Sequence, residues 1–501
     1  MNFQKFLEHS GLDHKQYQAE GVAWCISREQ EQEQEQEQEQ EQEQEQEQEQ
    51  EQEKSFSPKY CNGGIIADEM GLGKTITMIG TIVGNFKMPT LIILPVVLME
   101  QWKEQFQRTT GHSPYIYHGQ SKKATTITQL QKIPIILTSY GTVLSDAHKD
   151  NKLQQVKWSR IICDEAHHLR NRRTKITSIV NKLQTKTMWL ITGTPIQNHI
   201  NDLFSLFDIL KIPNKVYTDM SQLKDIMSTI VLRRTKKDVG IQLPSLHVNQ
   251  IQSNWTNKME QDLAEDIHEK MAFSKVNTNH RKTTSNKTTD ETPTPNVVPS
   301  GDILVLMLYA RMMCVYPSLV QNHISKMKSM GCVSTETRED GLKYSSKMDS
   351  VIQTILARKA NGNRKIVFAN FRGEIDYLKQ TLTDSGLTTE SIDGRVTSKR
   401  MRQEILNKDL DVLILQIKTG NEGLNLQQYN EVYFVTPEWN PKMEEQAIAR
   451  CHRIGQTKPV HVFRFIMNSF DQEQKTSNIE MYTRDIQDSK NEISREIMSS
   501  N

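Results

Sequence analysis

The chain lacks any long uninterrupted run of apolar residues. Its longest strongly apolar stretch, Leu91–Met99, is interrupted by Pro95 and falls far short of the roughly 20 residues that a membrane-spanning helix needs. The first residues show no apolar segment behind a basic one, so no secretory signal is visible. These absences predict a soluble, intracellular protein without a membrane partner.

Cysteines are few, and none of the six forms a C-x-x-C pair with another. This spacing argues against a disulfide framework and against a zinc module, and it fits a reducing compartment. His167 and His168 are adjacent, but no further Cys or His lies at ligand spacing from them. We therefore expect no zinc site.

Net charge is also nearly absent, at +1. However, residues 29–53 are a pure Glu-Gln alternation that holds 13 of the 61 acidic residues, so the rest of the chain carries about +14. A basic body of this kind suits a polyanionic partner.

Two segments have compositions that disfavour a packed core. Residues 29–53 contain no apolar side chain and are either coil or a solvated helix, whereas residues 274–302 are rich in Thr and Pro and indicate a linker or long surface loop. We interpret residues 1–245 as a first lobe that contains the Glu-Gln insert. Residues 246–345 are interpreted as a helical inter-lobe region, residues 346–470 as a second lobe and residues 471–501 as a polar helical tail.

Short apolar runs alternate with amphipathic stretches in both lobes. Such runs are typical of strands buried on both faces, and the alternation predicts parallel α/β sheets flanked by helices. The predicted strands are Thr90–Leu94, Ile133–Thr138, Ser159–Cys163 and Met188–Thr192 in the first lobe, and Lys365–Ala369, Asp411–Leu415, Glu431–Val435 and His461–Phe465 in the second.

The segment 63–75 ends as a phosphate-binding loop does. Gly71 and Gly73 allow backbone N–H groups to approach phosphates, Lys74 can reach the β- and γ-phosphate oxygens, and Thr75 offers a hydroxyl to magnesium. Asp68 stands where the strict pattern has Gly. The alternative is a chance glycine-rich loop.

Two adjacent acids follow the predicted strand Ser159–Cys163. Asp164 is placed to bind magnesium beside the phosphate loop, and Glu165 to orient or deprotonate the attacking water. The alternative is an acidic helix N-terminus that is favoured by the helix dipole.

Two arginines near the end of the second lobe form the third candidate site element, after the phosphate loop and the acidic pair. Arg450 and Arg453 are three positions apart, and hence share one face if the segment is helical. They could stabilise charge on a transferring phosphoryl group, or they could form a solvated basic face.

Taken in order, these segments resemble the Swi/Snf-type ATPases of helicase superfamily two, over about residues 12–466. The amino-acid sequence of residues 435–465 is similar to that of the repair-associated branch of this family. The cysteines that a RING finger requires are absent. The run before Gly423 also departs from the family, because Glu422 adds an acid there. The segments that carry the resemblance are 17–24, 68–75, 95–106, 138–140, 164–171, 192–198, 232–239, 311–320, 367–371, 423–426, 439–441 and 452–456.

The resemblance implies two tandem RecA-like lobes with an ATP cleft between them, and ATP and Mg²⁺ as cofactors. The implied cofactor-binding residues are Gln18, which would read adenine, and Asp68, Glu69, Met70, Gly71, Leu72, Gly73, Lys74, Thr75, Asp164 and Gly423. The resemblance implies Thr75 and Asp164 as magnesium ligands. The implied catalytic residues are Glu165, Arg450, Arg453 and Gln456. The residues expected to contact DNA or to couple hydrolysis to movement are Thr138, Ser139, Thr192, Thr194, Asn370 and Trp439.

The function implied by the resemblance is ATP-dependent translocation along double-stranded DNA, free or on nucleosomes, in remodelling, repair or transcription. Such a protein would work in the nucleus of a cell or at a viral replication site. Two alternatives stay open: a strand-separating helicase on DNA or RNA, and an inactive DNA-binding scaffold.

Overall fold

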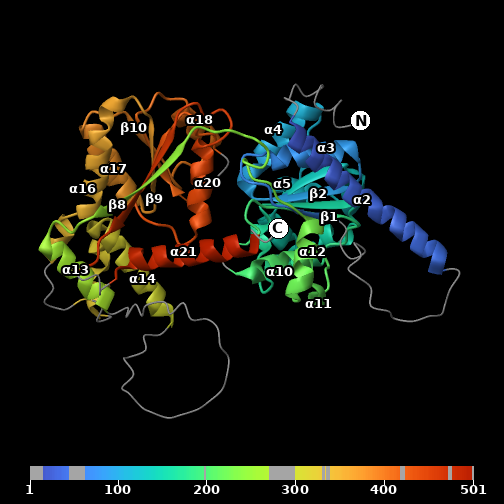
Figure 1. Cartoon of the computed structure of the whole chain (residues 1–501), viewed down its shortest axis with the longest axis horizontal. Coiled ribbons are helices and arrows are strands. Elements are labelled where there is room, and N and C mark those ends of the chain that lie inside the picture. Colours follow the sequence, from blue (N-terminus) through green and yellow to red (C-terminus); the bar gives the residue numbers. More distant parts are fainter. Residues whose placement is uncertain are drawn as a thin grey trace, which may run out of the picture. The chain divides into compact units, whose positions relative to one another are not determined.

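The computed structural model describes residues 15–43, 63–196, 199–269, 300–329, 333, 339–417, 424–471 and 477–498. The chain divides into two compact units, of which unit 1 is Met1–Leu243 with Lys490–Asn501 and unit 2 is Pro244–Ser489 (Figure 1). Each unit is built around a sheet of its own.

Unit 1 contains a seven-stranded sheet in the order β3-β4-β2-β5-β6-β1-β7, and every neighbouring pair is parallel. The register places Ile65 opposite Leu190 on one side and Val231 on the other. The strands are β1 (Gly63–Ile66), β2 (Thr90–Leu94), β3 (Tyr115–Ile116), β4 (Ile135–Ser139), β5 (Arg160–Asp164), β6 (Met188–Ile191) and β7 (Val231–Leu232).

Helices cover both faces of this sheet. Leu91 and Ile93 of β2 join a core with residues of α7, α9, α10 and α12, whereas Ile92 and Leu94 join a second core with residues of α3 and α4. This alternation follows from the two-residue period of a strand. The helices of unit 1 are α2 (Gln16–Glu43), α3 (Lys74–Gly84), α4 (Met99–Thr110), α5 (Gln120–Ala124), α6 (Ile127–Lys132), α7 (Tyr140–Lys149), α8 (Lys152–Gln155), α9 (Lys175–Asn181), α10 (Ile200–Ile209), α11 (Asn214–Tyr217) and α12 (Met220–Ile230).

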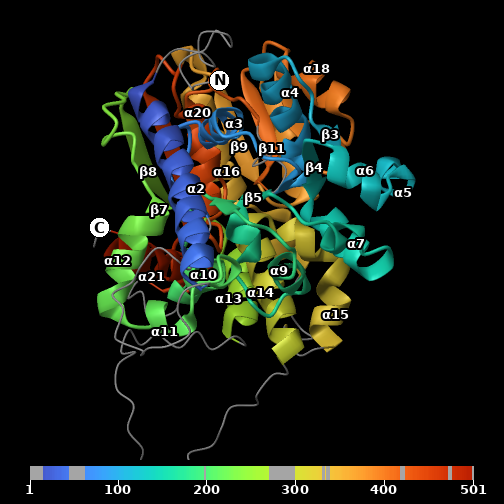
Figure 2. The same ribbon diagram turned by 90° about the vertical axis from the view of Figure 1, so that its right-hand side faces the viewer.

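The Glu-Gln run begins inside the folded unit, not beyond it. Helix α2 continues into the run as far as Glu43 and lies beside α3 (Figures 1 and 2). Glu29, the first residue of the run, is fully buried, and its carboxylate accepts hydrogen bonds from Arg160 at 2.5 and 2.8 Å and from Trp189 Nε1 at 2.8 Å. The expectation that this run is coil or a solvated helix outside any packed core is therefore wrong at its first residue.

Unit 2 contains a six-stranded sheet in the order β10-β11-β9-β12-β13-β8, again with parallel neighbours throughout. In Figure 1, α16 and α17 lie on one side of this sheet and α18 and α20 on the other. The strands are β8 (Leu246–Ser253), β9 (Lys365–Ala369), β10 (Thr389–Ile392), β11 (Val412–Gln416), β12 (Glu431–Phe434) and β13 (Val460–Met467). The helices are α13 (Lys258–Glu269), α14 (Ser300–Val315), α15 (Ile324–Ser329), α16 (Ser346–Ala357), α17 (Arg372–Asp384), α18 (Lys399–Leu406), α20 (Pro441–Cys451) and α21 (Ile479–Met498).

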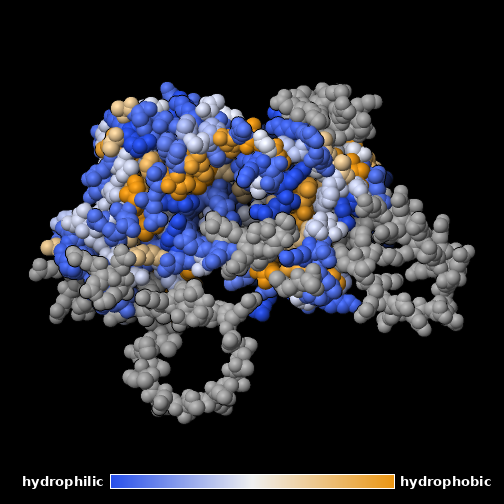
Figure 3. Space-filling model, in the orientation of Figure 1, coloured by the Kyte–Doolittle hydropathy of each residue, from blue (hydrophilic) through white to orange (hydrophobic). Residues whose placement is uncertain are grey.

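The prediction of two α/β lobes with parallel sheets is confirmed, and all eight predicted strands are present within two residues of their expected bounds. One strand falls in the region interpreted as helical: residues 246–253 form β8, which pairs with β13 along its whole length. Because β8 is the edge strand, most of its side chains are exposed. Apolar surface is visible in Figure 3 over the region where β8 runs in Figure 1, and Leu246 and Val248 are 40% and 50% exposed.

Among the helices that the structure describes, none combines the length and the apolar composition needed to cross a membrane.

Candidate functional site

The phosphate-loop segment lies between β1 and α3 of unit 1. Gly71 and Gly73 have φ angles of 95° and 81°, in the left-handed region that favours glycine. Helix α3 begins at Lys74, and among the described residues no side chain caps its first turn. A helix N-terminus of this kind presents backbone N–H groups that can bind phosphate oxygens.

Lys74 reaches back across the loop. Its Nζ donates to the carbonyl oxygen of Asp68 at 2.8 Å, which holds the loop closed around the ammonium group. Gly193 approaches from the segment after β6, because a Cβ built on it would lie 3.5 Å from Lys74 Nζ and 3.1 Å from Met70 Cγ. The structure thus brings the segment 192–194 against the phosphate loop.

The two acids of the loop face away from it, toward the segment that follows β7. Asp68 is fully buried, and its carboxylate accepts from Arg234 Nη2 at 2.6 Å and Nε at 3.1 Å. Glu69 pairs with Lys236 at 2.7 Å. Arg234 also donates to the carbonyl oxygen of Tyr17 and lies over the Tyr17 ring. In this structure these predicted cofactor-binding acids hold the loop in position.

Gln18, expected to read the adenine base, ties α2 to the same loop. Its Nε2 donates to the carbonyl oxygen of Leu72 at 3.1 Å, and the side chain is buried. A Cβ on Gly73 would lie 2.4 Å from this amide nitrogen, so a second reason for glycine at Gly73 is steric. Base recognition by Gln18 stays a prediction.

Asp164 is the last residue of β5, and its carboxylate is held from two sides. Trp102 Nε1 donates to Oδ2 at 2.6 Å, and the backbone N–H of Glu165 donates to Oδ1 at 2.9 Å. Burial and the neighbouring Glu165 carboxylate raise the pKa of Asp164 to about 6, and the Lys74 ammonium opposes this shift. The phosphate-loop lysine and the predicted metal-binding carboxylate are therefore close enough to interact.

Glu165 follows with a φ of 50°, an uncommon conformation for a residue with a side chain. Its carboxylate lies 3.1 Å from Nδ1 of His167, which stacks on His168. Burial lowers the pKa of His168 to about 4, so this ring is neutral at pH 7.

The phosphate loop, Asp164 and Glu165 have the chemistry needed to bind magnesium and a nucleoside triphosphate. The oxygen donors of Thr75 and Asp164 are the kind that Mg²⁺ prefers, and Mg²⁺ commonly keeps only one or two protein ligands beside phosphate oxygens. The neighbouring Glu165 carboxylate helps to raise the pKa of Asp164. A divalent cation bound here would neutralise the negative charge of the two carboxylates. In the part of the chain that the structure describes, no cluster of three or more His, Cys, Asp or Glu residues could hold a metal ion.

The hydroxyls of unit 1 that are expected to contact DNA or to couple hydrolysis to movement are buried. Thr138 Oγ1 donates to the carbonyl oxygen of Tyr117 at 2.9 Å, and Ser139 Oγ accepts from the N–H of Thr142 at the start of α7. Thr192 Oγ1 accepts from the N–H of Thr194 at 3.2 Å. In this conformation the hydroxyls of Thr138, Ser139 and Thr192 shape loops, and contact with DNA at these positions would require other atoms.

The arginine pair of unit 2 does not share a helix face. Arg450 occupies the last turn of α20, but the helix ends at Cys451, so Arg453 lies in the following turn. The premise of one helical face is therefore wrong, because the chain leaves the helix at His452, whose Nε2 lies 2.8 Å from the carbonyl oxygen of Pro244. Arg453 is half-buried, and burial lowers its pKa.

Gln456 holds this turn together. Its Nε2 donates to the carbonyl oxygens of Gln427 at 2.9 Å and Cys451 at 3.2 Å, and its Oε1 accepts from the N–H groups of Thr457 and Lys458 at 3.0 Å. The side chain is buried, which indicates a role in positioning the arginines.

The remaining predicted residues of unit 2 are spread over other elements. Asn370 follows β9, and its N–H donates to Glu374 Oε2 at 2.9 Å. Trp439 packs against an apolar core formed mainly by α13 and α14. Gly423 lies outside the described residues.

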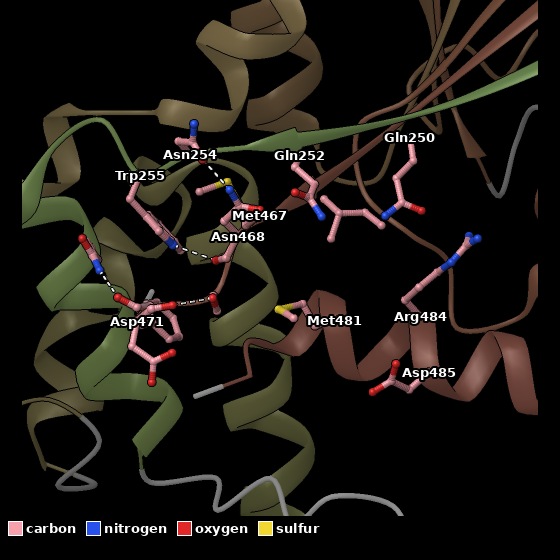
Figure 4. A pocket seen from close by; sticks show the side chains of 14 residues that line it. Gln250, Gln252, Asn254, Trp255, Met467, Asn468, Asp471, Met481, Arg484 and Asp485 are labelled. Carbon is pink, nitrogen blue, oxygen red and sulfur yellow. Dashed lines mark hydrogen bonds between the residues drawn. The ribbon is translucent and has the colours of Figure 1, made fainter. Parts of the chain in front are cut away.

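A separate cavity of about 650 Å³ opens in unit 2 where β8 and β13 end (Figure 4). Gln250, Gln252 and Arg484 line it together with Trp255, whose Nε1 donates to the carbonyl oxygen of Asn468 at 3.0 Å. None of the predicted site residues lines this cavity.

Three residues of the site were missed by sequence reasoning: Trp102, Tyr140 and Arg234. Their acceptors lie 62, 24 and 166 positions away in the chain. No local spacing pattern could have assigned these pairings, although all three residues fall in segments that carry the resemblance.

Comparison with known proteins was made at the levels of family, sequence and structure. A model of the SNF2-related domain matches residues 17–319, and a model of the helicase conserved C-terminal domain matches residues 346–455. The mouse (Mus musculus) chromodomain-helicase-DNA-binding protein 6 is 27% identical over 455 residues, which are 82% of this chain and 16% of that protein. An uncharacterized ATP-dependent helicase of Mycoplasma genitalium, MG018, is 29% identical over 490 residues, which are 91% of this chain and 41% of that protein.

The chain thus spans less than half the length of either relative. Among solved structures, the SWI2/SNF2 ATPase core of Sulfolobus solfataricus in complex with dsDNA is 22% identical, with 97% of each chain covered and a TM-score of 0.39.

Proposed function

Because the chain belongs to the SNF2-related family of helicase-like ATPases, we propose that it hydrolyses ATP to translocate along double-stranded DNA. The resemblance seen in the sequence is confirmed at the level of the family. The observation that carries the proposal is the position of the phosphate loop and of Asp164 and Glu165 in unit 1: the loop follows β1, Asp164 ends β5, and both strands are parallel neighbours of β6.

The residues of unit 1 divide the chemistry among them. Lys74 and the N–H groups at the start of α3 bind the phosphates, and Thr75 and Asp164 hold Mg²⁺, which supplies charge neutralisation to the transferred phosphoryl group. Glu165 orients the attacking water and accepts its proton. Arg450 and Arg453 of unit 2 stabilise the charge of the transition state, with Gln456 positioning them.

DNA is the proposed track for two reasons, and the resemblance to the Swi/Snf-type ATPases favours its duplex form. The chain outside the Glu-Gln run carries about +14, and the chromodomain relatives are named DNA-binding helicases. Phosphate contacts of this kind depend on salt and are largely independent of sequence. Roles in nucleosome remodelling, repair or transcription, and a nuclear or viral setting, belong to the same proposal.

The test is steady-state ATP hydrolysis at one fixed salt concentration, without nucleic acid and then with duplex DNA, single-stranded DNA, RNA or nucleosomes. We expect stimulation by duplex DNA and no turnover by Lys74→Ala. Stimulation mainly by single strands or RNA would move the protein to the strand-separating class. Turnover by Lys74→Ala would overturn the phosphate-loop assignment.

A further inference from the structure

Two aromatic side chains of unit 1 hold the predicted magnesium ligand, and neither has an assigned role. Trp102 of α4 donates from Nε1 to Asp164 Oδ2 at 2.6 Å, and Tyr140 of α7 donates from its hydroxyl to the carbonyl oxygen of Asp164 at 2.7 Å. We propose that Trp102 and Tyr140 are positioning residues that fix the Asp164 carboxylate for Mg²⁺. This inference rests on the proposed function.

Trp102 determines how the carboxylate can rotate. With Oδ2 bonded to the indole and Oδ1 bonded to the N–H of Glu165, the plane of the carboxylate is set before any metal arrives. Each oxygen retains a further lone pair for a cation. Both Trp102 and Asp164 are buried, so water cannot readily replace the indole N–H if it is removed.

Tyr140 fixes the backbone at the same residue. Its hydroxyl bonds the end of β5 just before the chain takes the left-handed conformation at Glu165, and its ring lies 5.1 Å from the ring of His168. The side chain and the main chain of Asp164 are therefore restrained from two different helices. Outer groups of this kind commonly alter metal affinity when they are mutated.

The simpler explanation is that every buried tryptophan and tyrosine needs an acceptor. Unit 1 contains matched examples that separate the two explanations. Trp158 is equally buried and donates to the carbonyl oxygen of Leu153 at 2.9 Å. Tyr117 is fully buried and donates to Asp146 Oδ1 at 2.8 Å. These bonds resemble those of Trp102 and Tyr140 in burial and length, but their acceptors are not site residues.

The experiment measures binding, not turnover. The affinity of the full chain for a fluorescent ATP analogue, excited directly and not through tryptophan, is measured with EDTA and with Mg²⁺, and the ratio gives the gain due to the metal. Variants are Trp102→Phe and Tyr140→Phe, with Trp158→Phe and Tyr117→Phe as controls, and thermal unfolding reports whether each is folded.

We expect Trp102→Phe to reduce the magnesium-dependent gain by about tenfold, with little change in EDTA, and Tyr140→Phe to reduce it in the same direction. The controls should keep the wild-type gain. The inference would be overturned if both site variants kept the wild-type gain, or if the control variants lost as much of it as the site variants. In either case, a magnesium-dependent gain in the wild-type protein would still support the proposed function. A wild-type protein without any magnesium-dependent gain would overturn the proposed function and the inference with it.

Discussion

At the scale of single residues, the acids Asp68 and Glu69 show how similar neighbours take unequal roles. Asp68 is buried and paired with Arg234, whereas Glu69 is 41% exposed and paired with Lys236. A buried carboxylate that loses its partner is costly, while an exposed ion pair contributes little. The position where the strict phosphate-loop pattern has glycine is therefore occupied by a structural anchor.

This contrast gives a matched pair of variants. Arg234→Ala should lower the free energy of unfolding by about 3 kcal/mol, because it leaves the Asp68 carboxylate buried without its main partner. Lys236→Ala should lower it by less than about 1 kcal/mol. Denaturant unfolding monitored by circular dichroism would measure both, and equal losses would contradict the assignment.

Some features of single residues could be predicted from the sequence, and others could not. The neighbourhood of Lys74 and Asp164 could be predicted, because a phosphate-loop pattern and an acid at the end of a predicted strand together imply one magnesium site. The buried positions of Thr138 and Gln456 could not, because a motif gives the identity of a residue without the direction of its side chain. The bond from Trp102 to Asp164 depends on how α4 packs on the sheet of unit 1.

At the scale of helices and strands, α2 is anchored by a residue that the repeat composition conceals. Glu29 reads as one more glutamate of the run, but it neutralises the fully buried Arg160. Glu29→Ala should lower the free energy of unfolding by about 3 kcal/mol, whereas the neighbouring, exposed Gln30→Ala should be nearly neutral.

The pairing of Glu29 with Arg160 also determines how much of the Glu-Gln run can be deleted without loss of stability. Deletion of residues 31–53 should preserve ATP turnover and the thermal unfolding temperature, and deletion of residues 29–53 should lower that temperature clearly. Equal stability of the two deletions would show that Glu29 does not anchor α2.

The buried carboxyl group of Glu374, in the first turn of α17, should make the stability of the protein depend on pH. Glu374 accepts from the N–H groups of Asn370 and Phe371 at 2.9 Å, and burial raises its pKa from the ordinary 4.5 to about 7. Between pH 4.5 and 7 the folded protein retains a proton that the unfolded chain has released, so the free energy of unfolding falls as pH rises through this window.

Glu374→Gln removes this titration. Relative to the variant, the wild-type protein should lose up to about 3 kcal/mol of unfolding free energy from pH 4.5 to 7. Glu404→Gln, at an exposed position of α18, serves as the control and should run parallel to the wild type. Parallel curves for Glu374→Gln would contradict the raised pKa.

Strands differ in how far the sequence determines them. The observed bounds of β2 and β9 are those predicted, because both strands are buried on both faces and are therefore apolar after their first residue. Strand β8 was missed because it is an edge strand with mostly exposed side chains, among them three polar amides. Its pairing with β13 joins segments more than two hundred residues apart, which no local pattern reveals.

At the scale of the whole molecule, the chain consists of two α/β units with separate sheets and cores. The phosphate loop and the acidic pair belong to unit 1, whereas Arg450 and Arg453 belong to unit 2. The proposed chemistry therefore requires residues from both units, although either unit alone has the architecture of a complete domain.

Arg453→Ala tests the contribution of unit 2. It should leave the affinity for the ATP analogue unchanged and reduce DNA-stimulated turnover by roughly 10³-fold, if the guanidinium stabilises the transition state. Single-turnover hydrolysis with saturating duplex DNA would measure the loss. A reduction below about tenfold would remove Arg453 from the catalytic machinery.

The most direct test of the account is displacement of a third strand from a triplex on blunt duplex DNA, run beside unwinding of a forked duplex under the same conditions. A translocase should displace the third strand with ATP and leave the forked duplex paired. Glu165→Gln should neither displace the third strand nor unwind the fork. Unwinding of the fork without triplex displacement would contradict translocation along double-stranded DNA.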